Sequence, residues 1–310
     1  MFHVICYMVF MTVYDQITHN KARTYAIILT FIFLVSGFFL LIGKFFESPT
    51  TYFLIGITFS LLSSIGSYFY SDRIVLFTTG AKPAQKKDFF DFYTVAENLA
   101  LAAGIPTPKL YVIHDAAPNA FATGRNPKLA VVCATTGLLQ KLERTELEGV
   151  IAHELSHVKN YDILVSSIVA VLVGTVALVS DWIMRSLWWG GLRRDENNRE
   201  NRNPFMMIFI IFVLILTPLV ATLIQLAVSR RREFLADASG TLLTRYPEGL
   251  ARALEKISTD KSVLRTASSS TAHLFIVNPF KKLGRTAFWF ANLFSTHPPV
   301  EERVRILRSM

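Results

Sequence analysis

The sequence predicts an α-helical membrane protein with about four transmembrane helices and an α+β body that contains a small β-sheet. Of its 310 residues, 52% are apolar and only 18% are charged, a composition too apolar for an ordinary water-soluble domain. Uncharged runs of 20, 24, 18 and 27 residues occupy positions 24–43, 48–71, 163–180 and 203–229. A helix needs about 20 residues to cross a hydrocarbon layer of about 30 Å. Each run is therefore a candidate span, the third near the lower limit of length.

The formal net charge of +9 could indicate a nucleic-acid partner. The basic residues form no stripe interleaved with aromatic side chains, however, and they cluster beside the uncharged runs. We therefore interpret them as charges that flank a membrane, and we expect no nucleic-acid partner. The two cysteines, Cys6 and Cys133, are far apart, which predicts neither a disulfide framework nor a thiolate metal site.

The first two runs predict a transmembrane hairpin over residues 24–71, preceded by an N-terminal cytosolic segment, 1–23. Lys21 and Arg23 precede the hairpin and three lysines follow it within 82–87, whereas the loop between the runs carries only Lys44 and Glu47. The positive-inside rule then places both ends of the hairpin, and the body that follows, in the cytoplasm. Translation could start at Met1 or at Met11, and the sequence leaves both open.

The other two runs predict a second membrane hairpin, 163–229, inserted between two parts of the body, 72–162 and 230–310. The connection, 185–202, carries five arginines against three acidic residues, so full crossing would put a basic loop outside, against the positive-inside trend. Either both segments cross the bilayer, which we expect, or the pair dips into it without crossing.

Within the body, an amphipathic helix is expected over 89–103, ended by Gly104 and Pro106. Short runs at 109–114, 119–124 and 129–133 predict three strands. The pattern Thr145-x-x-Glu148 is typical of a capping box, which predicts a further helix that begins near Thr145.

This last helix carries the sequence His153-Glu154-Leu155-Ser156-His157. Residues four apart lie on one face of a helix, so His153 and His157 can both bind one zinc ion. Glu154 lies one residue further round and can act as a general base on a water at the metal. The flanking residues are apolar and predict a buried helix, in which two histidines and a carboxylate are costly without a metal to bind.

Three more acidic residues are candidates for this site. Glu233 and Asp237 are again four apart, which indicates Glu233 as the third metal ligand and Asp237 as the acceptor of a hydrogen bond from a ligand histidine. The alternative is an amphipathic helix in which Glu233 pairs with a neighbouring arginine. Asp162, five residues after His157, is either an outer partner of a ligand or a charge on the helix surface.

These motifs, taken in order, resemble a known family. They are His-Glu-Leu-Ser-His-Val-Lys-Asn-Tyr-Asp at 153–162, the long apolar insert, Ser-Arg-Arg-Arg-Glu-Phe-Leu-Ala-Asp at 229–237 and Ser-Thr-His-Pro-Pro at 295–299. Together with Tyr-Asp-Gln-Ile at 14–17 and Asn-Lys-Ala-Arg-Thr at 20–24, they resemble the HtpX-type membrane-bound zinc metalloproteases, relatives of the CAAX prenyl proteases. The resemblance implies a zincin-like (gluzincin) body, one Zn²⁺ per chain, and a zinc endopeptidase in a bacterial-type cell membrane.

The same resemblance implies two further groups of site residues. His297 would donate a hydrogen bond to the developing oxyanion, unless it is an ordinary surface histidine in a turn. The strand that carries Asn119, Ala120, Phe121 and Ala122 would pair with an extended substrate backbone, unless these residues are plain sheet structure.

The family is associated with quality control of membrane proteins, which implies misfolded or damaged membrane proteins and other polypeptides as substrates. One alternative is a CAAX-type prenyl protease, although members of that branch usually carry more spans. The other alternative is a non-catalytic membrane scaffold, which would not need a base beside a metal. The oligomeric state is not predicted.

Overall fold

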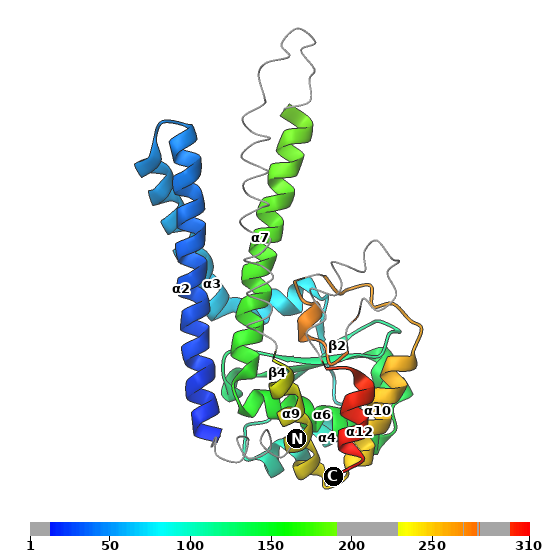
Figure 1. Ribbon diagram of the computed structural model, residues 1–310. Coiled ribbons are helices and arrows are strands. Elements are labelled where there is room, and N and C mark those ends of the chain that lie inside the picture. Colours follow the sequence, from blue (N-terminus) through cyan, green and yellow to red (C-terminus); the bar gives the residue numbers. More distant parts are fainter. Residues whose placement is uncertain (1–12, 191–228, 269, 278, 280–297) are drawn as a thin grey trace.

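Three long helices rise from one side of an α+β body in the computed structural model, which describes residues 13–190, 229–268, 270–277, 279 and 298–310 (Figure 1). They are α2 (Val13–Phe45), α3 (Pro49–Thr78) and α7 (Asp162–Gly190). Each holds a segment long and apolar enough to cross a membrane, at Asp15–Lys44, Pro49–Thr78 and Asp162–Asp181. The fourth predicted span, 203–229, lies outside the described residues except for its last residue.

The three long helices pack against one another through different kinds of surface. Apolar side chains from 27–38 of α2 and from 164–176 of α7 form one buried cluster. Helix α3 turns small residues inward, and a Cβ at Gly56 would lie 2.5 Å from the Cβ of Phe39, so this glycine allows α3 to approach α2 closely. Large apolar side chains such as Phe33 and Leu62 are exposed, as expected for contact with lipid.

The sheet of the body has four short strands in the order β1-β2-β4-β3. Strands β2 (Lys109–Ile113), β3 (Ala120–Thr123) and β4 (Val131–Thr135) overlap the three predicted runs, although β4 begins and ends two residues later than predicted. Strand β2 is parallel to β4, whereas β3 is antiparallel to β4 and lies at one edge. The fourth strand, β1 (Lys82–Pro83), pairs antiparallel with β2 and is too short to give a sequence pattern.

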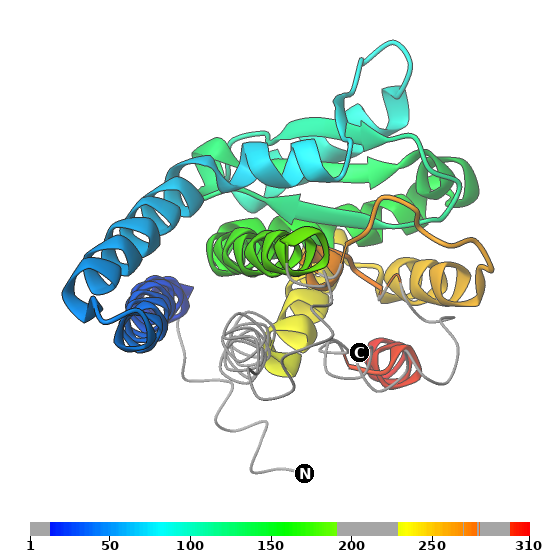
Figure 2. The ribbon, with the colours of Figure 1, turned by 90° about the horizontal axis from the view of Figure 1, so that it is seen from above.

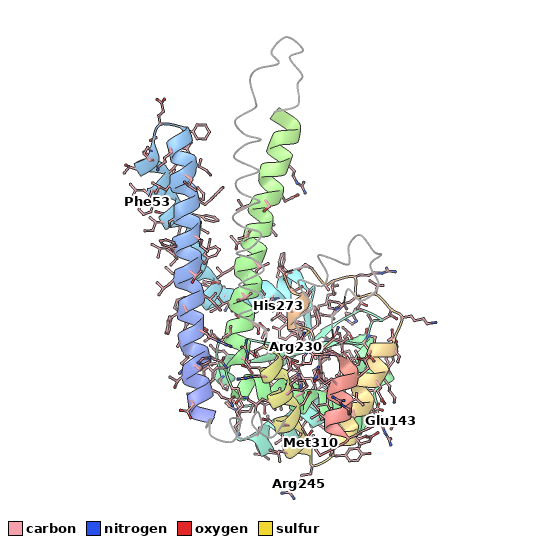
Figure 3. The ribbon with its side chains drawn as sticks, viewed as in Figure 1. Phe53, Glu143, Arg230, Arg245, His273 and Met310 are labelled. Carbon is pink, nitrogen blue, oxygen red and sulfur yellow. The ribbon has the colours of Figure 1, made fainter. Side chains whose placement is uncertain are left out.

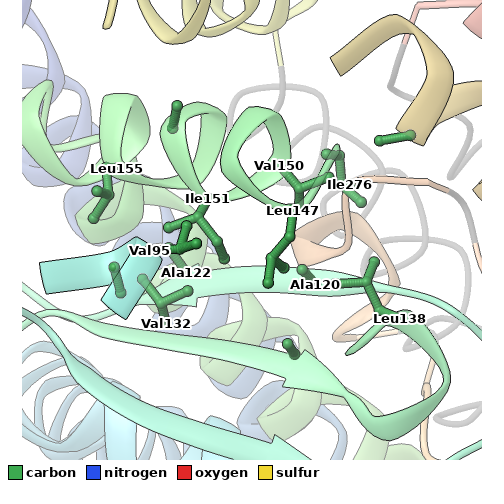
Figure 4. Packing of buried hydrophobic residues seen from close by; sticks show 14 of the residues in the cluster. Val95, Ala120, Ala122, Val132, Leu138, Leu147, Val150, Ile151, Leu155 and Ile276 are labelled. Carbon is green, nitrogen blue, oxygen red and sulfur yellow. The ribbon is translucent and has the colours of Figure 1, made fainter. Parts of the chain in front are cut away.

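Helix α6 (Arg144–Lys159) is the centre of the body and carries the His-Glu-x-x-His motif. One face packs on the sheet: Leu147, Ile151 and Leu155 point toward it, with Ala120 beside Leu147 and Ala122 below Ile151 (Figure 4). The remaining faces are covered by α4 (Phe90–Ala103), α9 (Arg230–Thr244) and α10 (Pro247–Thr259), with α12 (Val300–Leu307) packed on α9 and α10 (Figure 2). Short elements complete the body: α5 (Thr136–Lys141), η1 (Pro127–Leu129) and η2 (Ala272–Leu274).

The predicted capping box of α6 is wrong, although the helix begins at Arg144, one residue from the predicted start near Thr145. The helix is capped by Glu143, which forms a reciprocal capping box with Glu146, and the backbone N–H of Glu143 donates to Oε2 of Glu146 over 2.8 Å. The side chain of Glu146 is buried and also accepts from Lys256 of α10, over 2.7 Å. A contact with a distant helix therefore helps to fix the cap, and Thr145 lies inside the first turn.

Candidate active site

Two helices bring three potential metal ligands together. His153 and His157 come from α6, and Glu233 comes from the first turn of α9. Their ligand atoms all lie within 4.8 Å of one another. The two Nε2 atoms are 3.2 Å apart, and the Glu233 carboxylate oxygens lie 3.8 Å from Nε2 of His153 and 3.6 Å from Nε2 of His157. This close approach depends on Gly240, because a Cβ there would lie 3.0 Å from the backbone nitrogen of His153.

Each histidine is oriented by its own carboxylate. Oδ1 of Asp237 lies 2.9 Å from Nδ1 of His153, and Oδ2 of Asp162 lies 3.0 Å from Nδ1 of His157. With both Nδ1–H groups donating to carboxylates, the two Nε2 lone pairs face each other. The two Nε2 atoms are 3.2 Å apart, and their lone pairs repel unless a cation binds both nitrogens. The geometry therefore fits a bound metal ion.

The electrostatics of the metal-free chain agree with a cation at this place. Burial alone lowers the pKa of His157, but its hydrogen bond to Asp162 and the negative charge of Glu233 raise that pKa to about 9. Burial lowers the pKa of His153. The carboxylates around His157 thus favour a positive charge at this place.

Arg303 of α12 is a site residue that the sequence did not reveal. It is wholly buried, and its Nε and Nη2 donate to the two carboxylate oxygens of Asp237 over 2.8 and 2.6 Å. Burial raises the pKa of Asp237, but the Arg303 charge, together with the hydrogen bonds from His153 and Arg303, outweighs burial and holds that pKa at about 2. One signal in the sequence could have revealed it. Arg303 is a cation on the same helix face as the apolar residues Val300, Val304 and Leu307, and that face is buried.

Asn20 of α2 also reaches the site and was not predicted to do so. Its side-chain NH₂ group donates to the carbonyl oxygen of Asn160 and to Oδ1 of Asp162, each over 2.8 Å. Only Asn160 and Tyr161 link α6 to α7, and Tyr161 adopts a left-handed backbone with φ of 61°. This tight turn brings Asp162 back toward His157, and Asn20 fixes it there, so the first membrane helix contributes to the orientation of a candidate ligand.

Glu154 shares a cavity with the three candidate ligands. The cavity has a volume of about 40 Å³, and Ala122, His273 and Ile276 also line it. His273 lies at the foot of α7, where its Nε2 is 3.1 Å from the carbonyl oxygen of Ser166 (Figure 3). The space is close to that of one or two water molecules, so it is large enough to hold a water beside Glu154.

The structure places the predicted substrate-binding residues in three different surroundings. The backbone N–H of Ile276 donates to the carbonyl oxygen of Ala120 over 3.0 Å, and the Asn119 side chain donates to the carbonyl oxygen of Val277 over 2.9 Å. The chain itself thus contacts this end of the β3 edge. Ala122 lies on the part of β3 that borders the cavity. Phe121 packs instead against Phe275, with ring centroids 5.2 Å apart. The other predicted residue, His297, lies outside the described residues.

The site has two imidazoles and three carboxylates in one cavity, beside helices long and apolar enough to cross a membrane. These features define a metal-dependent hydrolase of the membrane-anchored class. The sequence matches peptidase family M48 over residues 87–310. The chain belongs to this family, and within it to the HtpX-type proteases, which confirms the resemblance seen in its motifs. It is a metalloprotease and a membrane protein, and the scaffold alternative has no support.

Its relatives align over nearly the whole chain. A protein described as "Protease HtpX homolog" from Tropheryma whipplei is 46% identical over 301 residues, which cover 96% of this chain and 98% of the relative. The relative of the same description from Caldanaerobacter subterraneus is 44% identical over 308 residues, with the same coverage. Among solved structures, S. mikatae Ste24p aligns with a TM-score of 0.47 and 18% identity, over 94% of this chain and 66% of that one.

Proposed function

We propose that the protein is a zinc-dependent endopeptidase that cleaves misfolded or damaged membrane proteins on the cytoplasmic side of a bacterial-type membrane. The observation that supports this most is the convergence of His153, His157 and Glu233 within 4.8 Å, with Glu154 in the same cavity. Two imidazoles and one carboxylate are a donor set that zinc accepts, and three protein ligands leave a fourth position open for catalysis.

When bound, zinc would supply Lewis-acid polarisation of the attacking water and of the scissile carbonyl. His153, His157 and Glu233 would hold it, with Asp237 and Asp162 fixing the two imidazole orientations. Glu154 is buried beside the ligands, accepts the proton of the attacking water and returns it to the leaving amine. His297 is the proposed donor to the developing oxyanion.

The substrate side of the proposal rests on strand β3. Addition of an extended peptide to a sheet edge uses backbone hydrogen bonds and tolerates many sequences, which suits a quality-control protease. Ala122 borders the cavity, so a peptide paired there would present its backbone to Glu154. To extend the pairing to Asn119 and Ala120, the peptide would have to displace residues 276–277.

The membrane segments belong to the catalytic framework in this proposal. Only two residues connect helix α6 to α7. Helix α9 begins at Arg230, directly after the fourth uncharged run, 203–229. We therefore treat 72–162 and 230–310 as one catalytic domain, with 163–229 as an insertion that visits the membrane between the metal ligands. The basic residues at both ends of the first hairpin favour a cytoplasmic position for this domain.

The decisive experiment compares two glutamates on one helix. Glu154→Gln should retain one zinc per chain, measured by elemental analysis, and lose cleavage of a model misfolded membrane protein. Glu148→Gln, on the exposed side of α6 beside Arg144, is the matched control and should retain both properties. Cleavage by the Glu154→Gln protein at the wild-type rate would refute the role of Glu154 as the base.

A third variant tests the ligand set. Glu233→Ala should lose zinc, and a normal zinc content would reassign the third ligand. The CAAX alternative is tested with the wild-type protein and two substrates. Cleavage of a prenylated peptide, without cleavage of an unprenylated membrane protein, would replace the proposed substrate class.

A further inference from the structure

A second cavity, much larger than the first, lies where the membrane helices meet the body. Its volume is about 610 Å³, against about 40 Å³ for the cavity at the candidate metal ligands. Its walls come from the start of α2, the late part of α3, the start of α7 and two loops of the body, 104–106 and 125–128. We refer to it as the interface cavity. Its volume is within the range of about 300–1,000 Å³ that is usual for small-molecule sites.

The interface cavity is positively charged. Lys21, Arg125 and Lys128 line it, and no acidic side chain is present among the described residues of its walls. Within the described part of the chain, none of these three cations forms an ion pair with a carboxylate. Two of them rest on aromatic rings instead: Nζ of Lys21 lies 5.0 Å from the ring centre of Tyr161, and the Arg125 guanidinium lies 5.1 Å from that of Phe69. Three unneutralised cations around one cavity favour an anionic ligand.

The position of the cavity along the membrane helices indicates which kind of anion it binds. Lys21 precedes the uncharged run of α2 by three residues, Tyr68 lies three residues before the end of the uncharged run of α3, and Leu164 is the second residue of the uncharged run of α7. The three wall segments therefore share one boundary between hydrocarbon and water. Tyr25 and Tyr68 place amphipathic rings at this boundary, as tyrosines do in the headgroup region of a bilayer.

We infer that the interface cavity binds the phosphate headgroup of an anionic phospholipid. Lys21, Arg125 and Lys128 contact the phosphate, and the acyl chains lie along the exposed apolar faces of α2 and α3. The bound headgroup touches Tyr161, which stands between Asn160 and Asp162 in the turn that leads from α6 to α7. The lipid site is thus one residue away from the carboxylate that orients His157.

The test uses the full-length protein in detergent micelles that contain either dioleoylphosphatidylglycerol or dioleoylphosphatidylcholine, with native mass spectrometry to count retained lipids. The wild type should retain one phosphatidylglycerol per chain and bind it at least about tenfold more tightly than phosphatidylcholine. Lys21→Gln with Lys128→Gln should weaken phosphatidylglycerol binding roughly thirtyfold, since each lysine contributes about a fivefold effect. Lys87→Gln with Lys109→Gln removes the same charge from exposed positions outside the cavity and should bind like the wild type.

Three results would overturn the inference. They are equal retention of the two lipids by the wild-type protein, equal losses in the two double variants, and displacement of phosphatidylglycerol by an excess of inorganic phosphate. The last result would show a site for free phosphate rather than for a lipid. The comparison of the two lipids uses only the wild-type protein, so it does not depend on the folding of any variant. A thermal unfolding curve checks that each variant is folded.

Discussion

Arg303 allows the most direct test of how the site is held together. Its guanidinium is 0% exposed and makes two hydrogen bonds, of 2.8 and 2.6 Å, to the carboxylate of Asp237, which in turn orients His153. Arg303→Met keeps much of the side-chain volume but leaves Asp237 buried without its cation. Removal of one partner from a buried ion pair costs roughly 3–5 kcal/mol of stability.

This cost corresponds to a large shift in thermal stability. One kcal/mol shifts Tm by about 2–4 °C in a body of 150–250 residues, so Arg303→Met should lower the Tm by roughly 6–20 °C. The assay is thermal unfolding of the zinc-loaded protein in detergent, followed by intrinsic fluorescence. Arg305→Met, two residues away on the exposed side of α12, is the matched control and should change stability by less than about 0.5 kcal/mol.

The double variant Arg303→Met with Asp237→Asn separates the ion pair from simple packing. Because the buried charge is then gone, the double variant should recover part of the stability that Arg303→Met loses. Zinc affinity should still be reduced, since Asn presents His153 with a weaker acceptor than a carboxylate. A Tm for Arg303→Met within a degree or two of the Arg305→Met control would refute this account of the pair.

Further predictions address the contacts that bring the helices together. Asn20→Leu should reduce zinc affinity roughly tenfold in a chelator competition, because it removes both hydrogen bonds to the α6–α7 turn, whereas exposed His19→Leu should not. Retention of wild-type affinity by Asn20→Leu would confine the role of α2 to anchoring. Gly240→Ala should cost roughly 1–3 kcal/mol, since its Cβ would meet the backbone of His153 at 3.0 Å; Gly174→Ala, whose Cβ would meet only Ser270 at 3.6 Å, should be tolerated. Equal Tm values for the two alanine variants would contradict this reasoning. Removal of zinc by a chelator should lower the Tm of the wild-type protein, and an unchanged Tm would show that the metal does not stabilise the fold.

Local patterns in the sequence predict much of this architecture. Charge-free runs of about 20 residues or more mark helices that can cross a membrane, so α2 and α3 are predicted from length and composition alone. The four-residue spacing of His153 and His157 predicts that their rings share a face of a helix, and in the structure their Nε2 atoms are 3.2 Å apart. In both cases the information lies within a few turns of one helix.

Contacts between distant segments are not available from such patterns. Arg303 meets Asp237 across 66 residues, and Asn20 meets Asp162 across 142 residues, so no local spacing connects either pair. The capping box of α6 was mispredicted for a similar reason, because Glu146 is held by Lys256, 110 residues away. The small volume of the cavity also depends on a distant segment, 273–276, that packs beside β3.

The two distant contacts have one consequence for how the site depends on the membrane. Asp237 is held by Arg303 from the body, whereas Asp162 is held by Asn20 from the first long helix. The carboxylate at His153 is thus held by an arginine of the domain, whereas the carboxylate at His157 is held by a helix that enters the bilayer and, over 3.4 Å, by Arg232 of α9. A soluble version without α2 would keep the Arg303 contact but leave Asp162 without the Asn20 hydrogen bond. We therefore expect the orientation of His157, rather than that of His153, to depend on an intact membrane hairpin.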